Sequence, residues 1–460
     1  MKVLKFGGSS VADADRIKTV VSIVLDIAKT ERIAVVFSAM KGVTDMLLTM
    51  ADKAEKGDAS YREDFAALTD KQKTAVDGLI ADEKEKEEVF SVLSGLLDEL
   101  KDILHGVELV KECSKRSKDL IASFGERLNC NLISAYIKSL GYAAEYVDAR
   151  EIIRTDASHG EAVVDFETTY GLIEKRLSGD NIYIVTGFIG STEEGVTTTL
   201  GRNGSDYSAA IVGAGVGASE VEIWTDVDGV LSADPRIVKD AFVLEEVSFA
   251  EAMELSFFGA KVIHPYTMIP AVEKNIPIVI KNTMNPSYPG TRIVKDAKRH
   301  KWPITGIASI PGVSLINIEG SGMMGTPGIA ARVFSALAES KINIIMISQA
   351  SSEHSICIVC RSSEARKAIS ALEKTLEYEK RARLVSRFDC INDLEIVAIV
   401  GENMRGTPGI AGRLFDAVGK AGINVHAIAQ GSSELNLSFV VDEKEGQKTI
   451  KTVHDAFFKA

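Results

Sequence analysis

Apolar residues in the first 300 positions follow two alternating spacings. Runs of four or five mostly apolar residues predict strands, and between them apolar residues recur every three or four positions, as in amphipathic helices. Strands alternating with helices indicate an α/β fold with a mostly parallel sheet. The predicted strands are Val3–Phe6, Ile33–Phe37, Ala143–Val147, Ile182–Thr186, Val221–Thr225 and Ile278–Lys281.

Residues 51–121 depart from this alternation. The segment is rich in charged residues, contains no proline and keeps a helical spacing throughout. We therefore predict a helical excursion from the sheet domain, forming a lid or a subdomain. Its charge run, Asp82–Glu88, is typical of a solvated helix face.

A repeat begins after Trp302-Pro303. Gly325–Arg332 reads GTPGIAAR, and Gly406–Arg413 reads GTPGIAGR 81 positions later. Such a repeat indicates two copies of one supersecondary unit. The strands predicted in the two copies are Ser314–Glu319, Asn343–Ser348 and Ser355–Cys360, then Leu394–Val400, Asn424–Ala429 and Asn436–Val441.

The two copies differ in how their last strand is supplied. The first copy has room for a fourth strand at Ala382–Phe388, whereas the second ends in a helix at about 446–458. One strand, Ile304–Ala308, is left over before the first copy. We predict that it completes the second unit, which makes the first an insertion within the second and pairs an otherwise open edge.

Length, composition and charge limit the possible classes of protein. The 460 residues are enough for two to four domains, and 45% of them are hydrophobic. A net charge of −12 argues against a general nucleic-acid binder. No apolar run reaches membrane-spanning length, and Met1 leads directly into a charged strand. We expect no membrane segment, no signal peptide and a cytoplasmic location.

The five cysteines fit a reducing compartment. Cys357 and Cys360 imitate a C-x-x-C motif, but they lie in an apolar run that predicts a strand. Residues three apart on a strand point to opposite faces, so we expect neither a zinc site nor a redox pair there.

The first polar turn follows the first predicted strand. Gly7, Gly8 and Ser9 separate this strand from an amphipathic helix, and Lys5 lies at the end of the strand. Glycines allow close approach of a ligand to the backbone, and free N–H groups at a helix start attract anions. The pattern suggests a phosphate cradle, although it is not a Walker A loop. The alternative is an ordinary βα turn.

Four later segments carry further candidate chemistry, each with a purely structural alternative. Ser38–Thr44 offers hydroxyl groups after the second strand, or a helix cap. Glu126 is suited to a substrate ammonium, or is a surface carboxylate opening a helix. Arg202 lies in a glycine-containing loop and is suited to bind a carboxylate with two hydrogen bonds. In the same segment, Asp206 is a candidate site residue, and in the alternative interpretation it only caps the following helix.

The fourth segment, Trp224–Arg236, contains a D-x-D-G fragment without the terminal Glu of a calcium loop, so we discount an EF-hand. Its Asp226 and Arg236 suit nucleotide contacts. Lys261 then brings a second lysine near the strand ends. The glycines of 213–217 precede a strand, which favours a helix stop over a dinucleotide site.

Five segments together resemble the aspartokinases of the amino acid kinase family: Lys5–Ser10, Leu200–Tyr207, Trp224–Gly229, Asp234–Arg236 and Phe258–Val262. The repeats resemble the paired ACT domains of these enzymes. Asn203 and the glutamine-containing repeat resemble the kinase half of bifunctional aspartokinase–homoserine dehydrogenases, although the sequence reaches Ala460 without a dehydrogenase half.

The resemblance implies a specific architecture. It consists of a three-layer αβα amino acid kinase domain with a mostly parallel sheet over 1–302, followed by two βαββαβ ACT domains. The first ACT domain, 312–388, is inserted in the second, which comprises 303–311 and 391–460.

The implied reaction is ATP-dependent phosphorylation of the β-carboxylate of L-aspartate to 4-phospho-L-aspartate, the first step toward lysine, threonine and methionine. An aspartate side chain is already ionised at pH 7 and needs no general base, so catalysis is positioning and charge stabilisation. We expect Mg²⁺ on the ATP phosphates, with no direct protein ligand.

By the resemblance, each candidate residue has a role. Lys5, Lys261 and Asp206 are catalytic, and Ser38, Thr44, Glu126, Phe188, Arg202 and Ser205 bind aspartate. The nucleotide contacts are Lys5, Gly7, Gly8, Ser9, Thr225, Asp226, Leu231, Arg236, Lys261 and Val262.

The repeats imply feedback inhibition by lysine, threonine or both, and assembly into a homodimer or tetramer. The candidate effector residues are Met324, Gly325, Thr326, Ile329, Asn343, Ile344, Gln349, Asn424 and Gln430. In the alternative, the repeats only dimerise the protein. Two further hypotheses are a kinase for glutamate or N-acetylglutamate and a non-catalytic amino-acid sensor. The tandem ACT pair and the Leu200–Asp206 motif oppose the first, and the presence of Lys5, Arg202 and Lys261 opposes the second.

Overall fold

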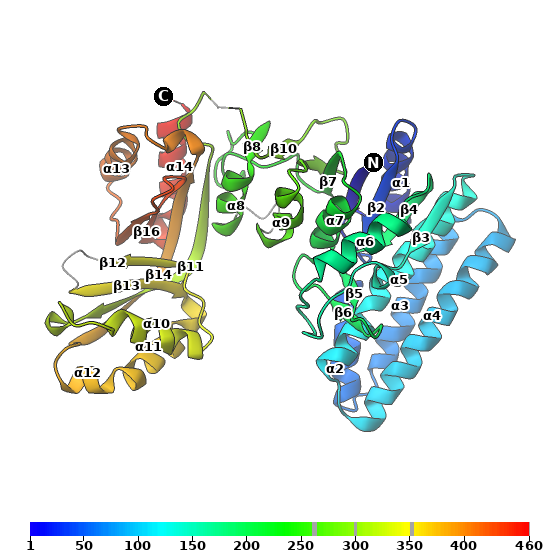
Figure 1. Ribbon diagram of the computed structural model, residues 1–460, viewed down its shortest axis with the longest axis horizontal. Coiled ribbons are helices and arrows are strands. Elements are labelled where there is room, and N and C mark those ends of the chain that lie inside the picture. The colour runs from blue at the N-terminus through cyan, green and yellow to red at the C-terminus, as the bar shows by residue number, and fades with distance from the viewer. Residues whose placement is uncertain (260–264, 299–300, 350–353, 460) are drawn as a thin grey trace. The chain divides into compact units, whose positions relative to one another are not determined.

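The computed structural model describes residues 1–259, 265–298, 301–349 and 354–459. The chain forms two compact units (Figure 1). The first comprises Met1–Val230, Glu245–Phe249 and Val262–Ala297, and the second Leu231–Leu244, Ala250–Lys261 and Lys298–Ala460. We expected the first domain to comprise residues 1–302. Two segments from within that range, Leu231–Leu244 and Ala250–Lys261, belong to the second unit instead.

An eight-stranded sheet forms the centre of the first unit, in the order β3-β4-β2-β1-β7-β9-β10-β8. All six strands predicted in this part of the chain are present, and they are mutually parallel as expected. Two short strands at one end of the sheet, β10 and β8, were not predicted, and β10 runs antiparallel to β9. The bounds are β1 Lys2–Phe6, β2 Ile33–Phe37, β3 Ala144–Val147, β4 Ile182–Thr186, β7 Glu220–Thr225, β8 Glu246–Ser248, β9 Ile278–Asn282 and β10 Thr291–Val294.

Helices pack on both faces of this sheet. Leu4 and Phe6 of β1 belong to a core shared with α1 and α5, while Val221 on the opposite face contacts Gly213 of α7 closely. A small hairpin, β5 with β6, lies beside the main sheet. These elements are α1 Ala14–Ala28, α5 Lys115–Ser139, η1 Ala149–Glu151, α6 Phe166–Arg176, β5 Ile189–Ser191, β6 Thr197–Thr199, α7 Gly204–Gly215 and α9 Pro265–Glu273.

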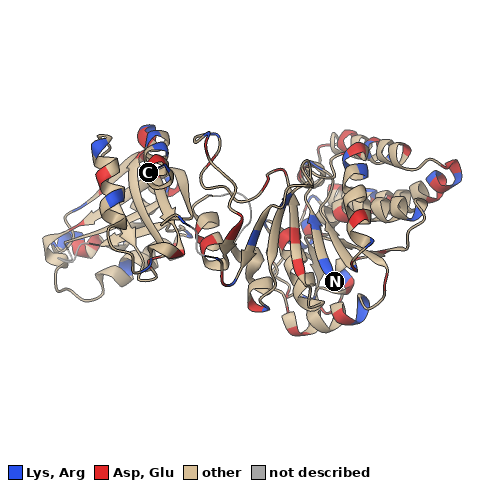
Figure 2. Cartoon of the chain, turned by 90° about the horizontal axis from the view of Figure 1, so that it is seen from above, with Lys and Arg blue, Asp and Glu red and all other residues tan. Residues whose placement is uncertain are grey.

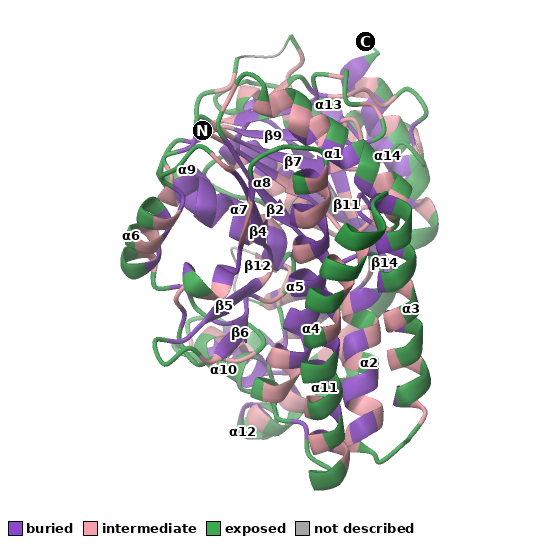
Figure 3. Ribbon diagram, turned by 90° about the vertical axis from the view of Figure 1, so that its right-hand side faces the viewer, coloured by how far each residue is buried: buried purple, intermediate pink, exposed green. Residues whose placement is uncertain are grey.

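The charged segment 51–121 is helical. It lies within α2 (Val43–Glu55), α3 (Tyr61–Leu79), α4 (Glu83–Val110) and the start of α5. Each of α2, α3 and α4 turns an apolar stripe into the core shared with α1, and Figure 3 shows their exposed faces on the outside. The charge run at the start of α4 is mostly exposed, and Figure 2 shows both signs of charge mixed along these helices.

A six-stranded antiparallel sheet lies at the centre of the second unit, and its strands follow the order β12-β13-β11-β14-β16-β15. Gly306–Ile310 of β11 pairs with Ile396–Val400 of β14, so the leftover strand completes the second repeat, as predicted. The bounds are β11 Gly306–Glu319, β12 Met346–Gln349, β13 Ser355–Arg361, β14 Arg387–Val400, β15 Ala427–Gln430 and β16 Asn436–Asp442.

Three strand starts in the second unit differ from prediction by three residues or more. The strand expected at Ala382–Phe388 begins only at Arg387, because 377–381 form the short helix α12 and Arg383 adopts a positive φ of 57°. β12 and β15 each begin three residues later than predicted, since the exposed Asn343 and Asn424 precede the paired stretch.

The helices of the second unit preserve the repeat in three dimensions. Gly328 and Gly409 precede α10 and α13 with φ of 93° and 90°. Arg332 and Arg413 then bond the equivalent carbonyls of Thr375 and Ala456. The elements are α8 Phe249–Phe257, η2 Ser321–Met323, α10 Ile329–Glu339, α11 Ser362–Thr375, α12 Glu377–Arg381, η3 Glu402–Met404, α13 Ile410–Lys420 and α14 Glu443–Phe458. Of all the helices in the described ranges, none is both long and apolar enough to cross a membrane.

Candidate active site

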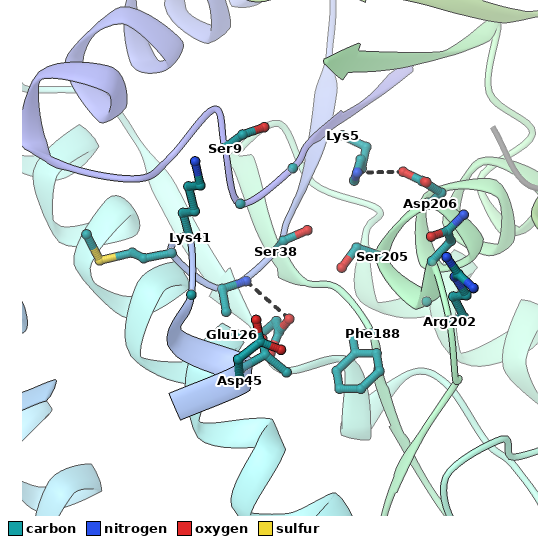
Figure 4. A pocket seen from close by; sticks show the side chains of 18 of the residues that line it. Lys5, Ser9, Ser38, Lys41, Asp45, Glu126, Phe188, Arg202, Ser205 and Asp206 are labelled. Atoms are coloured by element: carbon teal, nitrogen blue, oxygen red, sulfur yellow. Dashed lines mark hydrogen bonds and ion pairs between the residues drawn. The ribbon is translucent and has the colours of Figure 1, made fainter. Parts of the chain in front are cut away.

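A cavity of about 450 Å³ opens in the first unit, near the carboxyl ends of β1 and β2 (Figure 4). This is the edge at which α/β folds bind ligands. The cavity brings together residues from distant parts of the sequence, from Lys5 to Asp206. Among its lining residues are the predicted Lys5, Gly7, Gly8, Ser9, Ser38, Thr44, Glu126, Phe188, Arg202, Ser205 and Asp206.

Lys5 and Asp206 form an ion pair across the cavity. The Lys5 Nζ lies 2.5 Å from Asp206 Oδ1, and only 12% and 13% of the two side chains are exposed. Lys5 comes from β1 and Asp206 from the first turn of α7. The carboxylate therefore fixes the direction of the ammonium, and the pair partly offsets the cost of burying either charge.

The glycine turn after β1 packs tightly against the segment that follows β2. A Cβ atom on Gly8 would lie 2.8 Å from the carbonyl oxygen of Ala39, which no side chain tolerates without a backbone shift. The turn is closed by a bond from the Ser10 N–H to the Gly7 carbonyl. Close packing of two backbones is thus the local reason for glycine at this position.

The helix that supplies free N–H groups is not the one we predicted. α1 begins only at Ala14, and Asp13 caps it by accepting from the Arg16 N–H. The cavity instead meets the starts of α2 and α7, which follow Gly42 and Asn203 in left-handed conformations. Neither helix has a side-chain cap in the described structure, so both leave positive helix ends available to an anion.

Glu126 is the buried carboxylate of the cavity. Its Oε1 accepts a hydrogen bond of 3.1 Å from the Ala39 N–H, while Oε2 has no hydrogen-bond partner among the described residues. Burial raises the pKa of this carboxyl from 4.5 to about 8. A half-satisfied buried carboxylate that lines a cavity is suited to a cationic group of a ligand.

Arg202 lies in an exposed loop, on the side of the cavity opposite Glu126 (Figure 4). The loop leaves the β5–β6 hairpin, where the Leu200 N–H donates to the Phe188 carbonyl, and turns at Gly201 with a φ of 75°. Arg202 makes no ion pair within the described structure, so its guanidinium is available to a carboxylate.

Of the predicted nucleotide residues beyond the cradle, none of those that the structure describes lines this cavity. Thr225 ends β7 and Asp226 follows it, and the Thr225 hydroxyl donates to the Asp226 carboxylate at 3.2 Å. Leu231 and Arg236 belong to the second compact unit, where Arg236 grips Asp234 with a fork of hydrogen bonds. Lys261 and Val262 lie outside the described residues.

Several lining residues were not predicted. Lys41 and Asp45 lie in or beside the Ser38–Thr44 segment, which the sequence had singled out for its hydroxyl groups alone. A polar segment directly after a parallel strand could have indicated Lys41 and Asp45 as site residues by the same argument that indicated the hydroxyl groups. The remaining additions are Ala39, Met40, Gly42, Gly201, Asn203 and Gly204, which contribute mainly backbone or packing.

A second cavity of about 310 Å³ lies in the first repeat of the second unit. Gly325, Thr326, Ile329 and Gln349 of the predicted effector set line it. Met324 is 58% exposed, and neither it nor Asn343 nor Ile344 lines the cavity. The other lining residues are Met323, Pro327, Gly328, Ala330 and Ile356. In the second repeat, Asn424 and Gln430 are exposed.

Residues 1–282 match the amino acid kinase family, and 316–376 and 397–457 match the ACT domain. Over its whole length the chain is 36% identical to aspartokinase 1, chloroplastic, of Arabidopsis thaliana, covering 80% of that protein. The chain belongs to the aspartokinase family. A bifunctional aspartokinase/homoserine dehydrogenase 2 from the same plant is 38% identical over 99% of the chain.

Solved structures of aspartokinases share this fold. E. coli aspartokinase III, in complex with aspartate and ADP, is 30% identical with a TM-score of 0.80, and 99% of each chain is covered. The Clostridium acetobutylicum aspartate kinase is also 30% identical, with a TM-score of 0.84 over 99% of this chain and all of that one. The chain spans about half the length of the bifunctional aspartokinase relatives.

Proposed function

We propose that this protein transfers the γ-phosphoryl group of ATP to the β-carboxylate of L-aspartate, giving 4-phospho-L-aspartate. One observation carries the proposal: three charged side chains line a single cavity. They are a buried carboxylate with one oxygen unbonded and an arginine without an ion pair, both judged among the described residues, and a lysine held by an ion pair. The relative from E. coli was solved with aspartate and ADP. Glu126 is suited to the ammonium of aspartate and Arg202 to its α-carboxylate, with the β-carboxylate directed toward Lys5.

The chemistry demands charge stabilisation rather than proton transfer. The nucleophile is an ionised carboxylate and the electrophile a polyanion, so repulsion between them is the main obstacle. The Lys5 ammonium and the uncapped starts of α2 and α7 meet this demand. Ser9, Ser38, Thr44 and Ser205 add hydroxyl donors, and Phe188 closes the wall of the cavity.

The cavity fits a nucleotide whose Mg²⁺ is carried by its phosphates. Within the described structure the lining carboxylates are Asp45, Glu126 and Asp206, and Asp206 is already bonded to Lys5. Thr225, Asp226, Leu231, Arg236, Lys261 and Val262 stay proposed nucleotide contacts. When bound, Mg²⁺ would neutralise phosphate charge at this site.

An assay with aspartate, glutamate and N-acetylglutamate as parallel acceptors tests the activity. We expect ATP consumption and acyl phosphate with aspartate alone, and loss of turnover by orders of magnitude in Lys5→Ala. Equal rates with glutamate would replace the proposal with a related kinase. Absence of turnover with every acceptor would favour an amino-acid sensor.

We further propose that lysine or threonine inhibits the enzyme through the second unit, and that the ACT repeats assemble a cytoplasmic homodimer or tetramer. The cavity beside Gln349 supports an effector site. The E. coli relative was also solved with lysine and aspartate. Calorimetry with each amino acid tests the regulation, and light scattering tests the assembly; no heat and no inhibition with either would leave the repeats as a scaffold.

A further inference from the structure

Asp119 is a buried carboxylate that lies outside the lining of the active-site cavity. Only 4% of the residue is exposed. Its Oδ1 accepts from the Thr199 hydroxyl at 2.7 Å, and its Oδ2 accepts from His159 Nδ1 at 2.8 Å and from the Gly160 N–H at 3.1 Å. A carboxylate only accepts, so His159 carries its hydrogen on Nδ1. Three donors from two separate segments thus converge on one charge.

The helix that carries Asp119 also carries the carboxylate of the cavity. Asp119 precedes Glu126 on α5 by seven residues, which is two turns, so both side chains project from the same face. One turn further, Asn129 donates to the Ser38 carbonyl at 2.7 Å. One side of α5 therefore holds the end of β2, through Glu126 and Asn129, and the β5–β6 hairpin, through Asp119.

The groups bonded to Asp119 lie at the base of the Arg202 loop. Thr199 ends β6, three residues before Arg202. The Ala162 N–H donates to the Thr199 carbonyl at 3.0 Å. A Cβ atom on Gly201 would lie 3.0 Å from the Glu161 Cγ and 3.3 Å from the Gly160 carbonyl oxygen. The turn at 159–161 thus packs directly against the base of this loop.

We propose that Asp119 is a positioning residue for amino-acid binding: it fixes the separation between Glu126 and Arg202. This inference rests on the proposed function, in which these two groups hold the ammonium and the α-carboxylate of aspartate. The ammonium and the α-carboxylate of aspartate must be bound at the same time. Helix α5 carries Glu126, which binds the ammonium, and through Asp119 it also positions Arg202, which binds the α-carboxylate.

The expected defect is selective because the nucleotide does not need this separation. If the Arg202 loop is free to move, binding aspartate must also order the loop, which weakens binding. The Lys5–Asp206 pair comes from β1 and α7 and makes no bond to Asp119. The KM for aspartate should therefore rise, while the KM for ATP and the kcat at saturating aspartate stay close to those of the wild type.

Thr199→Val tests this inference with nearly unchanged side-chain volume. It removes one bond to Asp119, and Thr199→Ser restores the hydroxyl. Thr169→Val is the matched control, because the Thr169 side chain is also fully buried and its hydroxyl accepts from the Arg154 N–H at 3.0 Å. Asp119→Asn is a second, more severe variant.

We expect the KM for aspartate to rise at least fivefold in Thr199→Val and to return toward the wild-type value in Thr199→Ser. In Thr169→Val we expect a comparable loss of thermal stability and an unchanged KM. If Thr199→Val matched Thr169→Val in all kinetic constants, or raised both KM values in parallel, the positioning role would be overturned. Failure of the proposed function is distinct from either result, since the wild type itself would then show no aspartate phosphorylation.

Discussion

At the scale of single residues, the site depends on charges whose environment changes their behaviour. Glu126 is the clearest case, because burial holds its carboxyl neutral over a pH range in which an exposed glutamate is ionised. A substrate ammonium beside it would favour the ionised form. Binding of aspartate should therefore release a proton near neutral pH.

The pH dependence of binding follows from this shift. As the pH rises from 6 toward 8, a growing fraction of the free enzyme has Glu126 ionised, so the KM for aspartate should fall. Glu126→Gln should raise this KM and remove its dependence on pH in that range. Steady-state kinetics at fixed ionic strength measure both effects, and a variant with the wild-type pH profile would contradict the role of Glu126.

The same shift predicts the pH dependence of stability. The pKa of Glu126 is higher in the folded protein, about 8, than its ordinary value of 4.5, so the folded state binds the proton more tightly. This contribution is fully present below pH 4.5 and is lost as the pH rises toward 8. When the pH is raised from 5 to 8, the free energy of unfolding should decrease less in Glu126→Gln than in the wild type. Denaturant titration at several pH values measures both decreases.

Lys41 is a cation that the sequence did not single out. Figure 4 shows its ammonium directed toward the turn that carries Ser9, and it forms no ion pair within the described structure. An exposed cation beside a polyanion contributes about 0.5–1 kcal/mol, less at high salt. Lys41→Gln should raise the KM for ATP about threefold, and the exposed Lys101→Gln on α4 is the control. A KM for ATP equal in both variants would contradict this prediction.

At the scale of elements, the approach of two loop backbones builds the cradle. The turn after β1 and the segment after β2 contact at Gly8 and Ala39, so the first must lack a side chain. The prediction of a glycine turn came from local sequence. By contrast, the contact of this turn with Ala39 depends on the parallel pairing of β1 with β2, which places the two loops side by side.

Gly8→Ala and Gly95→Ala form a contrasting pair. The added methyl group of Gly8→Ala would meet the Ala39 carbonyl at 2.8 Å. At Gly95, inside α4, an added methyl group would have no atom of the described structure within 4 Å beyond its chain neighbours and the backbone of its own helix. We expect Gly8→Ala to lose about 1–3 kcal/mol of stability and most activity. Gly95→Ala should gain up to about 1 kcal/mol with unchanged kinetics. Thermal denaturation and turnover measure both, and a fully active Gly8→Ala would contradict the proposed packing.

At the scale of the whole molecule, segments early in the sequence belong to the second compact unit. Glu251 of α8 accepts from the Thr305 hydroxyl at 2.5 Å and from the Glu402 N–H at 2.9 Å. Ser232 lies 3.2 Å from Nε2 of the buried His454, on the last helix. The proposed nucleotide contacts Leu231 and Arg236 lie in this unit. The second unit is therefore held together by contacts between segments that lie far apart in the sequence.

Inhibition should accordingly depend on the cavity of the first repeat. Gln349→Ala should weaken inhibition by the effective amino acid at least tenfold, and the exposed Gln447→Ala on α14 should leave it unchanged. Calorimetry of effector binding, with and without aspartate and ATP, provides the second measurement. Coupling is reciprocal, so the substrates must weaken effector binding by the factor by which the effector weakens theirs. Effector affinity independent of both substrates would contradict the coupling.

Local sequence determined the six parallel strands, the repeat and its inserted topology, because apolar periodicity and self-similarity record which faces are buried. It also singled out Lys5, Glu126 and Arg202. Only the tertiary structure decided that α2 and α7, rather than α1, present free helix starts to the cavity. It alone joined Asp119 to Thr199, 80 residues away. Such contacts depend on how the helices and the hairpin pack around the sheet, and no spacing along the chain encodes them.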